Sequence, residues 1–351
     1  MTMENLRYRP TLEPEKIVQR LAGLFIPGSL ADPDMESRIG RLDGRFRIYS
    51  ACSPHGLWAP GLNITGEMRG TTEIYLPLAE IRLAFLRLFS ISLHYDPFLK
   101  SSALQTSATW LDLLHRLQPL VRQPNPARIL RQLMNDGGFR ARFLFSLFLP
   151  RHYGGGFNRY PSQLAFLRDW LRANRPKGGV RCLDAACGSG EGTYELALLL
   201  LQEGYDPKDI EVQGVTVEPL ELFAAAHGWF PHDPERQVAF RDHISPIFGE
   251  GISQGITFCC EDLTADSAPA DAEYDLILCN GLLGGPLLHD SEQLAGTAAR
   301  LSARLKQGGI LMAADRFHGG WEGSRSDSLR NMLASNGLKV VEMTEGVAGI
   351  K

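Results

Sequence analysis

The chain has 351 residues, of which 44% are hydrophobic and 22% charged, and its formal net charge at pH 7 is −4. This composition is typical of a globular protein, and no apolar run approaches the roughly 20 residues that cross a bilayer, which excludes membrane insertion. The length allows two domains of ordinary size.

Three features of the sequence bear on where the protein is found in the cell and on what it binds. The first residues, MTMENLRYRPTLEPEK, are polar and partly acidic, unlike a secretory signal, so we expect a cytoplasmic protein. The six cysteines match neither a zinc ribbon nor a CxxC motif, so we expect reduced thiols and no metal site. Residues 1–150 hold 18 Lys and Arg against 13 Asp and Glu, but this small excess is scattered, which predicts a solvated surface and no nucleic-acid partner.

The first predicted domain spans residues 1–150 and is mainly helical. Apolar residues recur at helical spacing in four segments: Glu15–Leu24, Leu76–Phe89, Trp110–Leu120 and Ala127–Met134. We interpret Arg45–Ser50 (RFRIYS) and Glu73–Leu76 as short strands, and the Gly- and Pro-rich residues 53–72 as a loop. This domain is a candidate for binding the substrate or a partner.

The second predicted domain spans residues 151–351, and in it strands alternate with helices. The predicted strands are Val180–Asp184, Ile210–Val217, Ile256–Cys260, Tyr274–Cys279 and Ile310–Ala314, with one or two more after Gly337. The predicted helices are Gly192–Gln202, Pro219–Phe230, Ser291–Leu305 and Ser326–Ser335. This alternation predicts an α/β fold with a doubly wound, Rossmann-like, mostly parallel sheet.

A glycine-rich turn joins the first of these strands to its helix, within Arg181–Ala197 (RCLDAACGSGEGTYELA). In doubly wound sheets the ligand lies beyond the carboxyl ends of the strands, where this turn enters the helix. The glycines at 188, 190 and 192 form neither GxGxxG nor a phosphate loop, but they allow a backbone to approach a ligand closely. Glu191 at the helix start would repel a pyrophosphate and attract an ammonium group, so we predict a ligand that carries an amine.

Two further acidic residues follow the next two strands. Glu218 ends the second strand, where an acidic side chain accepts hydrogen bonds from ribose hydroxyls in this fold. Asp262 follows the third strand, within reach of a base edge. An amine, a ribose and a base together predict S-adenosylmethionine as the cofactor. With EYDLILCN and LKQGGIL following in order, the pattern predicts a methyltransferase.

Residues 150–351 resemble the class I methyltransferases, and within them the CheR-type chemotaxis glutamate methyltransferases. The AACxxGEE turn of that family is similar to Ala185–Gly192 (AACGSGEG), and its phenylalanine–arginine segment is similar to Phe157–Pro161 (FNRYP). The family's sugar-binding strand and following helix match GVTVEPLELFAAAHGWF, its next two strands match ITFCCEDL and YDLILCN, and its closing hairpin matches KVVEMTEGVAGIK.

This resemblance implies roles on the methionine side of the cofactor. Arg159 would meet the cofactor's carboxylate, which suits its permanent charge and forked donors, and Glu191 would meet the amino group. We therefore expect Arg159 to belong to the cofactor site although it precedes the first strand of the sheet. The turn residues that would lie against the cofactor are Ala186, Gly188 and Gly190.

The resemblance also implies roles on the nucleoside and acceptor sides. Glu218 would bind the ribose, with Thr216 as the alternative contact, and Asp262 with Leu263 would border the adenine. Asn280, after the fourth strand, would face the methyl-transfer site.

The sequence departs from the family pattern mainly where the acceptor is bound. After Asn280 the run GLLGGPLLHD lacks the arginine and the tyrosine that the family carries there. Thr216-Val217-Glu218 keeps only the second acid of the family's acidic pair, and Gly154–Gly156 replaces a segment that holds a threonine. The pattern thus indicates a retained cofactor site beside a changed acceptor site.

Three hypotheses for the function remain open from the sequence. The first is a methyltransferase acting on a small molecule, the second is a CheR-type protein carboxyl methyltransferase, and the third is a non-catalytic protein that binds the cofactor. A catalytic base is needed only if the acceptor must lose a proton, so no catalytic residue is assigned. The possible acceptor-side groups are His152, Tyr153, His289 and Asp315.

Overall fold

The computed structural model describes residues 6–53, 57–100, 102–118, 120–149, 156–176, 178–265, 273–280, 282–283, 288, 290–314 and 325–351. Within these residues the chain forms two units, each described by itself. Unit 1 takes residues 13–149 and 230–237. Unit 2 takes residues 6–12, 156–229 and 238–351.

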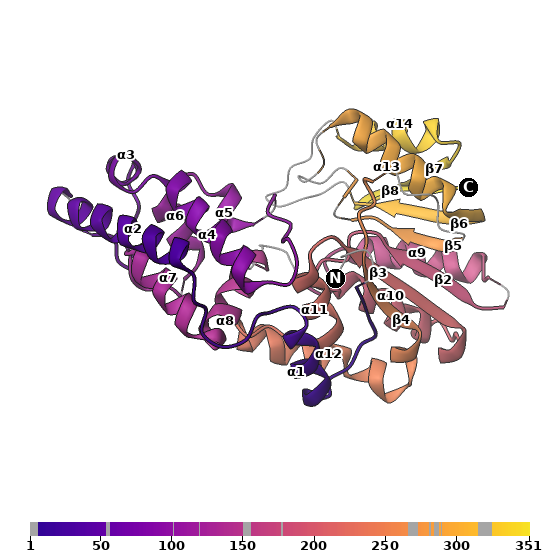
Figure 1. The fold of residues 1–351 in the computed structure, drawn as a ribbon. Coiled ribbons are helices and arrows are strands. Elements are labelled where there is room, and N and C mark those ends of the chain that lie inside the picture. The colour runs from indigo at the N-terminus through magenta and orange to yellow at the C-terminus, as the bar shows by residue number, and fades with distance from the viewer. Residues whose placement is uncertain are drawn as a thin grey trace. The chain divides into compact units, whose positions relative to one another are not determined.

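Unit 1 is helical throughout its described elements (Figure 1). The helices are α1 (Pro14–Ala22), α2 (Pro33–Cys52), α3 (Gly66–Tyr75), α4 (Leu78–Ser92), α5 (Ala103–Thr106), α6 (Trp110–Arg116), α7 (Pro126–Asn135) and α8 (Gly137–Phe148). Their buried faces meet in a core rich in aromatic side chains, where Phe85 of α4 stacks on Phe143 of α8 with ring centroids 5.4 Å apart. Offset aromatic pairs of this kind add to the free energy gained by burying their area.

The short strands predicted at residues 45–50 and 73–76 are wrong. Residues 45–50 lie inside α2, where the buried side chains Met35, Ile39, Leu42 and Tyr49 follow a helical period over a window longer than RFRIYS. The loop predicted for residues 53–72 also ends early, because Thr65 accepts a hydrogen bond from the Met68 N–H and starts α3.

Residues 73–75 form the last turn of α3, and residues 76 and 77 lead from it into α4. The carboxylate of Glu73 accepts a hydrogen bond from the backbone N–H of Leu78 at the start of α4, at 3.2 Å. This contact satisfies one of the donors that a helix start leaves without an intrahelical partner. Residues 73–76 therefore end one helix and lead into the next, so the strand pattern of this four-residue window is overruled by the longer helical period around it.

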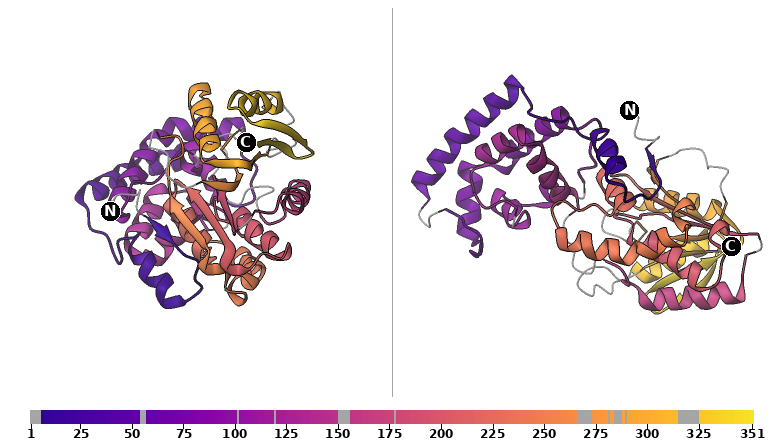
Figure 2. Two further views of the ribbon diagram at one scale, coloured as in Figure 1. Left: turned by 90° about the vertical axis from the view of Figure 1, so that its right-hand side faces the viewer. Right: turned by 90° about the horizontal axis from the view of Figure 1, so that it is seen from below.

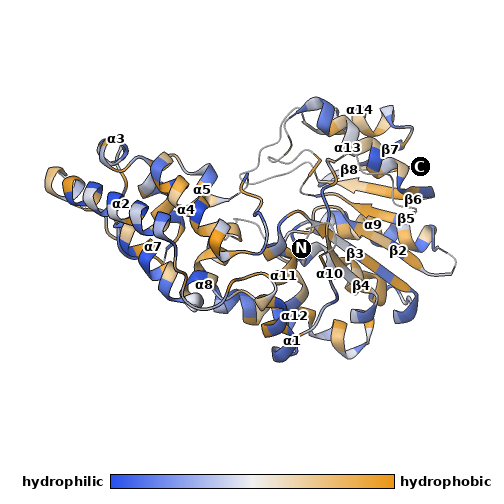
Figure 3. Ribbon diagram, viewed as in Figure 1, coloured by the Kyte–Doolittle hydropathy of each residue, from blue (hydrophilic) through white to orange (hydrophobic). Residues whose placement is uncertain are grey.

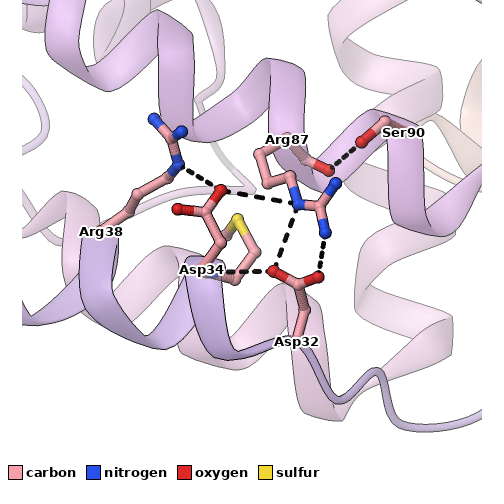
Figure 4. Close-up of polar contacts among 6 residues, drawn as sticks. Asp32, Asp34, Arg38, Arg87 and Ser90 are labelled. Carbon is pink, nitrogen blue, oxygen red and sulfur yellow. Dashed lines mark hydrogen bonds and ion pairs between the residues drawn. The ribbon is translucent and has the colours of Figure 1, made fainter.

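An ion-pair network fixes the start of α2 against α4 (Figure 4). Asp32 caps α2 by accepting the Met35 N–H at 2.8 Å, and its carboxylate also pairs with the guanidinium of Arg87. Asp34 bridges this pair to Arg38 at 2.9 Å. The hydrogen bond from Arg87 is the main reason why the pKa of Asp32 lies below its ordinary value.

Unit 2 is built on an eight-stranded sheet in the order β1-β4-β3-β2-β5-β6-β8-β7. The strands are β1 (Arg7–Tyr8), β2 (Val180–Asp184), β3 (Ile210–Thr216), β4 (Ile256–Cys260), β5 (Tyr274–Leu278), β6 (Leu305–Ala313), β7 (Lys339–Met343) and β8 (Gly346–Ile350). The five from β2 to β6 are parallel, whereas β1, β7 and β8 join by antiparallel pairing. The predicted α/β fold with a mostly parallel, doubly wound sheet and a mainly helical N-terminal part is confirmed.

Helices cover both faces of this sheet, as the two further views in Figure 2 allow the reader to follow. The helices are α9 (Pro161–Ala173), α10 (Glu191–Gln202), α11 (Pro219–His227), α12 (Pro234–Gly249), α13 (Ser291–Ala303) and α14 (Arg325–Ser335). Alternate strand residues such as Leu183, Ile277 and Leu311 pack with Leu301 of α13 and Leu333 of α14. The central strands are apolar (Figure 3), because a parallel strand buried on both faces meets no water.

Residues 6–12 add an edge to the sheet that the sequence did not indicate. Tyr8 of β1 lies opposite Phe258 of β4, and the side chain of Tyr8 packs on the rings of Phe223 and His227. The fully buried His227 ring also pairs through Nδ1 with the backbone carbonyl of Thr11, at 3.0 Å. These contacts attach the segment to α11 and β4.

Within the described part of the chain, no helix is long and apolar enough to span a bilayer.

Candidate functional site

The strand order defines where a ligand would bind. From β2 the chain moves outward through β3 to β4, and then returns to the opposite side of β2 to form β5. Ligands of doubly wound sheets bind beyond the carboxyl ends of the strands at such a reversal. The turn after β2 and the residues that follow β3, β4 and β5 all lie at this edge, because these strands are parallel.

The turn between β2 and α10 is shaped by two glycines in the left-handed region. Gly190, with φ +92°, faces the protein, since a Cβ there would lie 2.8 Å from the Cβ of Ala225 and 3.1 Å from the Phe258 ring. Gly188, with φ +51°, faces open space, since a Cβ there would have no heavy atom within 4 Å. Gly190 therefore closes the turn against α11 and β4, while Gly188 leaves backbone accessible to a ligand.

Asp184, the last residue of β2, is an acidic group of this edge to which the sequence assigned no role. Its side chain is 3% exposed, and it accepts a hydrogen bond from the hydroxyl of Thr193 at 2.8 Å. Burial raises the pKa of Asp184 to about 7, with a further contribution from Glu191 and Glu195, although the hydrogen bonds from Thr193 and the backbone of Ala186 oppose this. A buried aspartate beside two other carboxylates favours its protonated form for these reasons.

Glu191 occupies the first turn of α10, where the sequence placed it. It is half-buried, and its carboxylate accepts a hydrogen bond from the hydroxyl of Ser189 at 2.7 Å. Glu195 lies one turn further along α10, and burial is the main cause of its raised pKa. The start of α10 thus concentrates negative charge beside the glycine turn, which suits a cationic group and disfavours a phosphate.

The segment that carries Arg159 is attached to the same helix. The backbone N–H of Asn158 donates a hydrogen bond to Glu195, and Asn158 has a left-handed φ of 56°. Phe157 stacks on the ring of His243 in α12, with centroids 3.7 Å apart. Arg159 itself is half-buried and its guanidinium lies 5.1 Å from the centroid of the Tyr160 ring. These contacts bring the segment next to α10, although it precedes β2 in the chain.

Glu218 and Thr216 differ sharply in what their side chains do. Glu218 is 3% exposed and caps α11 by accepting the Leu220 N–H at 3.1 Å. The hydroxyl of Thr216 donates to the carboxylate of Glu221 at 2.7 Å, and it accepts the Glu218 N–H at 3.3 Å. Both side chains therefore help to order the junction of β3 and α11.

Asp262 and Leu263 lie directly after β4. The carboxylate of Asp262 is exposed and accepts hydrogen bonds from the N–H and the hydroxyl of Thr264, at 2.8 and 2.6 Å. Leu263 is 8% exposed and belongs to the hydrophobic core beneath this edge. An apolar side chain beside an acceptor of hydrogen bonds is suited to a base ring.

Asn280, after β5, forms hydrogen bonds within the protein through both its amide nitrogen and its amide oxygen. It donates to Gln163 of α9 at 2.6 Å, and its oxygen accepts from the Gln163 amide at 3.0 Å and from the Ala314 N–H at 2.9 Å. The two side-chain amides thus form a paired contact that links α9 to the ends of β5 and β6. The four acceptor-side candidates, His152, Tyr153, His289 and Asp315, lie outside the described residues.

Comparison with known proteins shows what unit 2 is similar to. Residues 156–316 match the family model of the CheR methyltransferase, SAM binding domain. The "Probable biofilm formation methyltransferase WspC" of Pseudomonas aeruginosa is 27% identical over 140 residues, which are 36% of this chain and 33% of that protein. The chain therefore spans about a third of the length of this curated relative.

Two solved structures illustrate the structural similarity. A TehB-like SAM-dependent methyltransferase from Corynebacterium glutamicum has 18% identity and a TM-score of 0.33, and the match covers 54% of this chain and 92% of that one. The sugar N-methyltransferase KedS8 from Streptoalloteichus has 15% identity and a TM-score of 0.34, over 54% of this chain and 87% of that one. Scores this low do not bear on function.

The family match confirms the resemblance to CheR-type class I methyltransferases. Residues 156–316 of unit 2 are thus similar to a SAM-binding methyltransferase domain of this type, and S-adenosylmethionine is the cofactor.

Proposed function

We propose that the protein transfers the methyl group of S-adenosylmethionine to a carboxylate side chain of another protein. The observation that carries this proposal is the CheR match, which runs from residue 156 to residue 316 and so includes the segments after β5 and β6 as well as the glycine turn. A carboxylate acceptor is already ionised near neutral pH, so it needs no base to activate it.

The methionine end of the cofactor is proposed to lie between α10 and the Arg159 segment. Glu191 would pair with the ammonium group and Arg159 with the carboxylate, and the opposite charges of these two side chains match the two ends of an amino acid. The contact of Asn158 with Glu195 supports this assignment, because it attaches the arginine-bearing segment to the helix that Glu191 begins. Gly188 would allow the backbone to approach the cofactor.

The nucleoside is proposed to lie along the ends of β3 and β4. Glu218 would accept hydrogen bonds from the ribose hydroxyls, and its orientation is already set by the cap on Leu220. Asp262 and Leu263 would border the adenine. The cofactor supplies a methyl group on a sulfonium, and the remaining task of the chain is to align the acceptor with it and to exclude water.

A small-molecule acceptor is the second candidate. The observation that favours it is the sequence after Asn280, GLLGGPLLHD, which lacks the arginine and tyrosine of the CheR family at this point. A changed acceptor segment on a retained cofactor domain is what a new substrate class would require.

A labelling experiment separates these candidates. The purified chain is incubated with S-adenosylmethionine that carries a tritiated methyl group and with an extract of the cells in which the protein occurs naturally. The products are then divided into protein and low-mass fractions. The proposal predicts label in the protein fraction that mild alkali releases as volatile methanol, as expected for a carboxyl methyl ester. Label in the low-mass fraction alone would establish the second candidate. Cofactor binding without any transfer would indicate a non-catalytic protein.

A further inference from the structure

The start of α9 is held by groups that are remote in sequence. Its N-cap residue, Tyr160, makes no side-chain cap, and Pro161 occupies the first turn. The backbone N–H groups of Ser162 and Gln163 instead donate to one carboxylate oxygen of Glu345, at 2.7 and 3.3 Å. Glu345 lies in the turn between β7 and β8, 183 residues away from Ser162.

A carboxylate at this position is well placed to fix the helix start. The first N–H groups of a helix have no intrahelical partner, and the helix dipole favours a negative charge beside them. The side chain of Tyr160 supplies no cap, and the carboxylate of Glu345 accepts the N–H groups of both Ser162 and Gln163. It therefore fixes the direction in which the chain enters α9.

Gln163 holds the same turn of α9 from its other side. It is 1% exposed, and it exchanges two hydrogen bonds with the amide of Asn280. The orientation of both amides is determined, because the Ala314 N–H can only donate and so requires the oxygen of Asn280 to point toward it. Neither amide can flip without leaving a buried polar group unpaired, which is costly.

Arg159 comes two residues before α9 and is thereby confined at both ends. On its N-terminal side, Asn158 is bonded to Glu195 of α10. On its C-terminal side, the first turn of α9 is held by Glu345 and, through Gln163, by Asn280. A side chain whose flanking backbone is fixed at both ends loses less conformational entropy when it binds a ligand.

We infer that Glu345 and Gln163 are positioning residues that hold Arg159 in place for the carboxylate of the cofactor. This inference rests on the proposed role of Arg159. It also assigns Asn280 an indirect effect on the cofactor, exerted through its amide pair with Gln163 and the start of α9.

The test compares two ligands that differ in the amino-acid end. S-adenosylhomocysteine carries the carboxylate, whereas 5′-methylthioadenosine lacks it, and both affinities are measured by calorimetry on the full chain. We expect Glu345→Ala to weaken S-adenosylhomocysteine about tenfold and to leave 5′-methylthioadenosine within about twofold of the parent. Glu345→Gln retains an oxygen that can accept both N–H groups, so it should restore most of the affinity.

The matched control is Glu342→Ala. Glu342 lies on β7 of the same hairpin, but its exposed carboxylate pairs with Arg330 and does not contact α9 in any hydrogen bond described here. This variant should bind both ligands as the parent does. Circular dichroism and the melting temperature show that each variant is folded before it is titrated.

A double-mutant cycle decides between positioning and a general structural role. In an Arg159→Ala background, Glu345→Ala should cause no further loss of S-adenosylhomocysteine affinity, because the group that it positions is gone. Losses that add in full, an equal loss for both ligands, or parent-like binding by Glu345→Ala would each overturn the inference. A parent chain that binds neither ligand would instead refute the proposed function itself.

Discussion

Asp184 should make the stability of unit 2 fall as the pH rises toward neutrality. Burial raises the pKa of this carboxyl to about 7 from its ordinary value of 3.8. Between these two pH values the folded chain therefore binds more protons than the unfolded chain. The contribution of Asp184 to the free energy of unfolding is fully present below pH 4 and is lost as the pH rises to 7. A pKa difference of this size corresponds to a free energy on the order of 4 kcal/mol in full, of which about 3 kcal/mol falls between pH 5 and pH 8.

The variant Asp184→Asn isolates this contribution. Asparagine has nearly the same shape and stays neutral at every pH, and its amide can donate to the hydroxyl oxygen of Thr193. Urea titrations followed by circular dichroism at pH 5 and pH 8 give the free energy of unfolding of both proteins. We expect the variant to gain about 3 kcal/mol relative to the parent between these pH values.

The control for this experiment removes a carboxylate from the protein surface. Asp242 is exposed on α12, and Asp242→Asn shows what the loss of a surface carboxylate alone does to the two titrations. If Asp184→Asn also follows the parent at both pH values, Asp184 is ionised in the folded protein at neutral pH, and the argument from its burial is refuted.

Three further predictions follow from the same structure. An ammonium group paired with Glu191 would lower the pKa of Asp184, so binding of S-adenosylhomocysteine at pH 7 should release on the order of half a proton, and calorimetric enthalpies that are identical in buffers of different ionisation enthalpy would contradict this. Gly190→Ala should lower the free energy of unfolding in urea by about 2–4 kcal/mol, because its φ is left-handed and the new Cβ would overpack against α11. Gly188→Ala should lower that free energy by only about 1 kcal/mol but should weaken the binding of S-adenosylhomocysteine. Equal melting temperatures for the two variants would contradict this prediction. The parent should lose stability as the pH falls through the lowered pKa of Asp32, below 3.8, and Asp32→Asn should lack this component in acid titrations followed by circular dichroism.

The sheet could be predicted from the sequence because its strands are apolar runs separated by turn residues. The strand–helix alternation from Val180 on places acidic side chains at strand ends, and parallel pairing then brings those ends to one edge. One helix and one strand gave weaker signals. α8 is buried nearly all round, from Phe139 to Phe148, so no amphipathic period marks it. The two-residue β1 is too short for any pattern to be visible.

The contacts that organise the candidate site were beyond sequence reasoning. Asn158 is bonded to Glu195, and the backbone of Ser162 and Gln163 is bonded to Glu345. These hydrogen bonds join residues that are 37 to 183 positions apart, so no local sequence pattern predicts them. The protonation of Asp184 likewise depends on burial, which the letter sequence DAACGSGEG does not reveal. Motifs therefore located the edge of the sheet, and tertiary packing decides how its side chains are held.

The most direct test of the account compares Glu191→Gln with Glu218→Ala on two ligands. If Glu191 pairs with the ammonium group, Glu191→Gln should weaken S-adenosylhomocysteine by about 1.5–3 kcal/mol and barely change the affinity for 5′-methylthioadenosine, which lacks the amino-acid end. If Glu218 holds the ribose, Glu218→Ala should weaken both ligands to a similar degree. The four dissociation constants are measured by titration calorimetry on variants shown to be folded. Equal losses on both ligands for Glu191→Gln, or parent-like binding of both by Glu218→Ala, would contradict the proposed cofactor site.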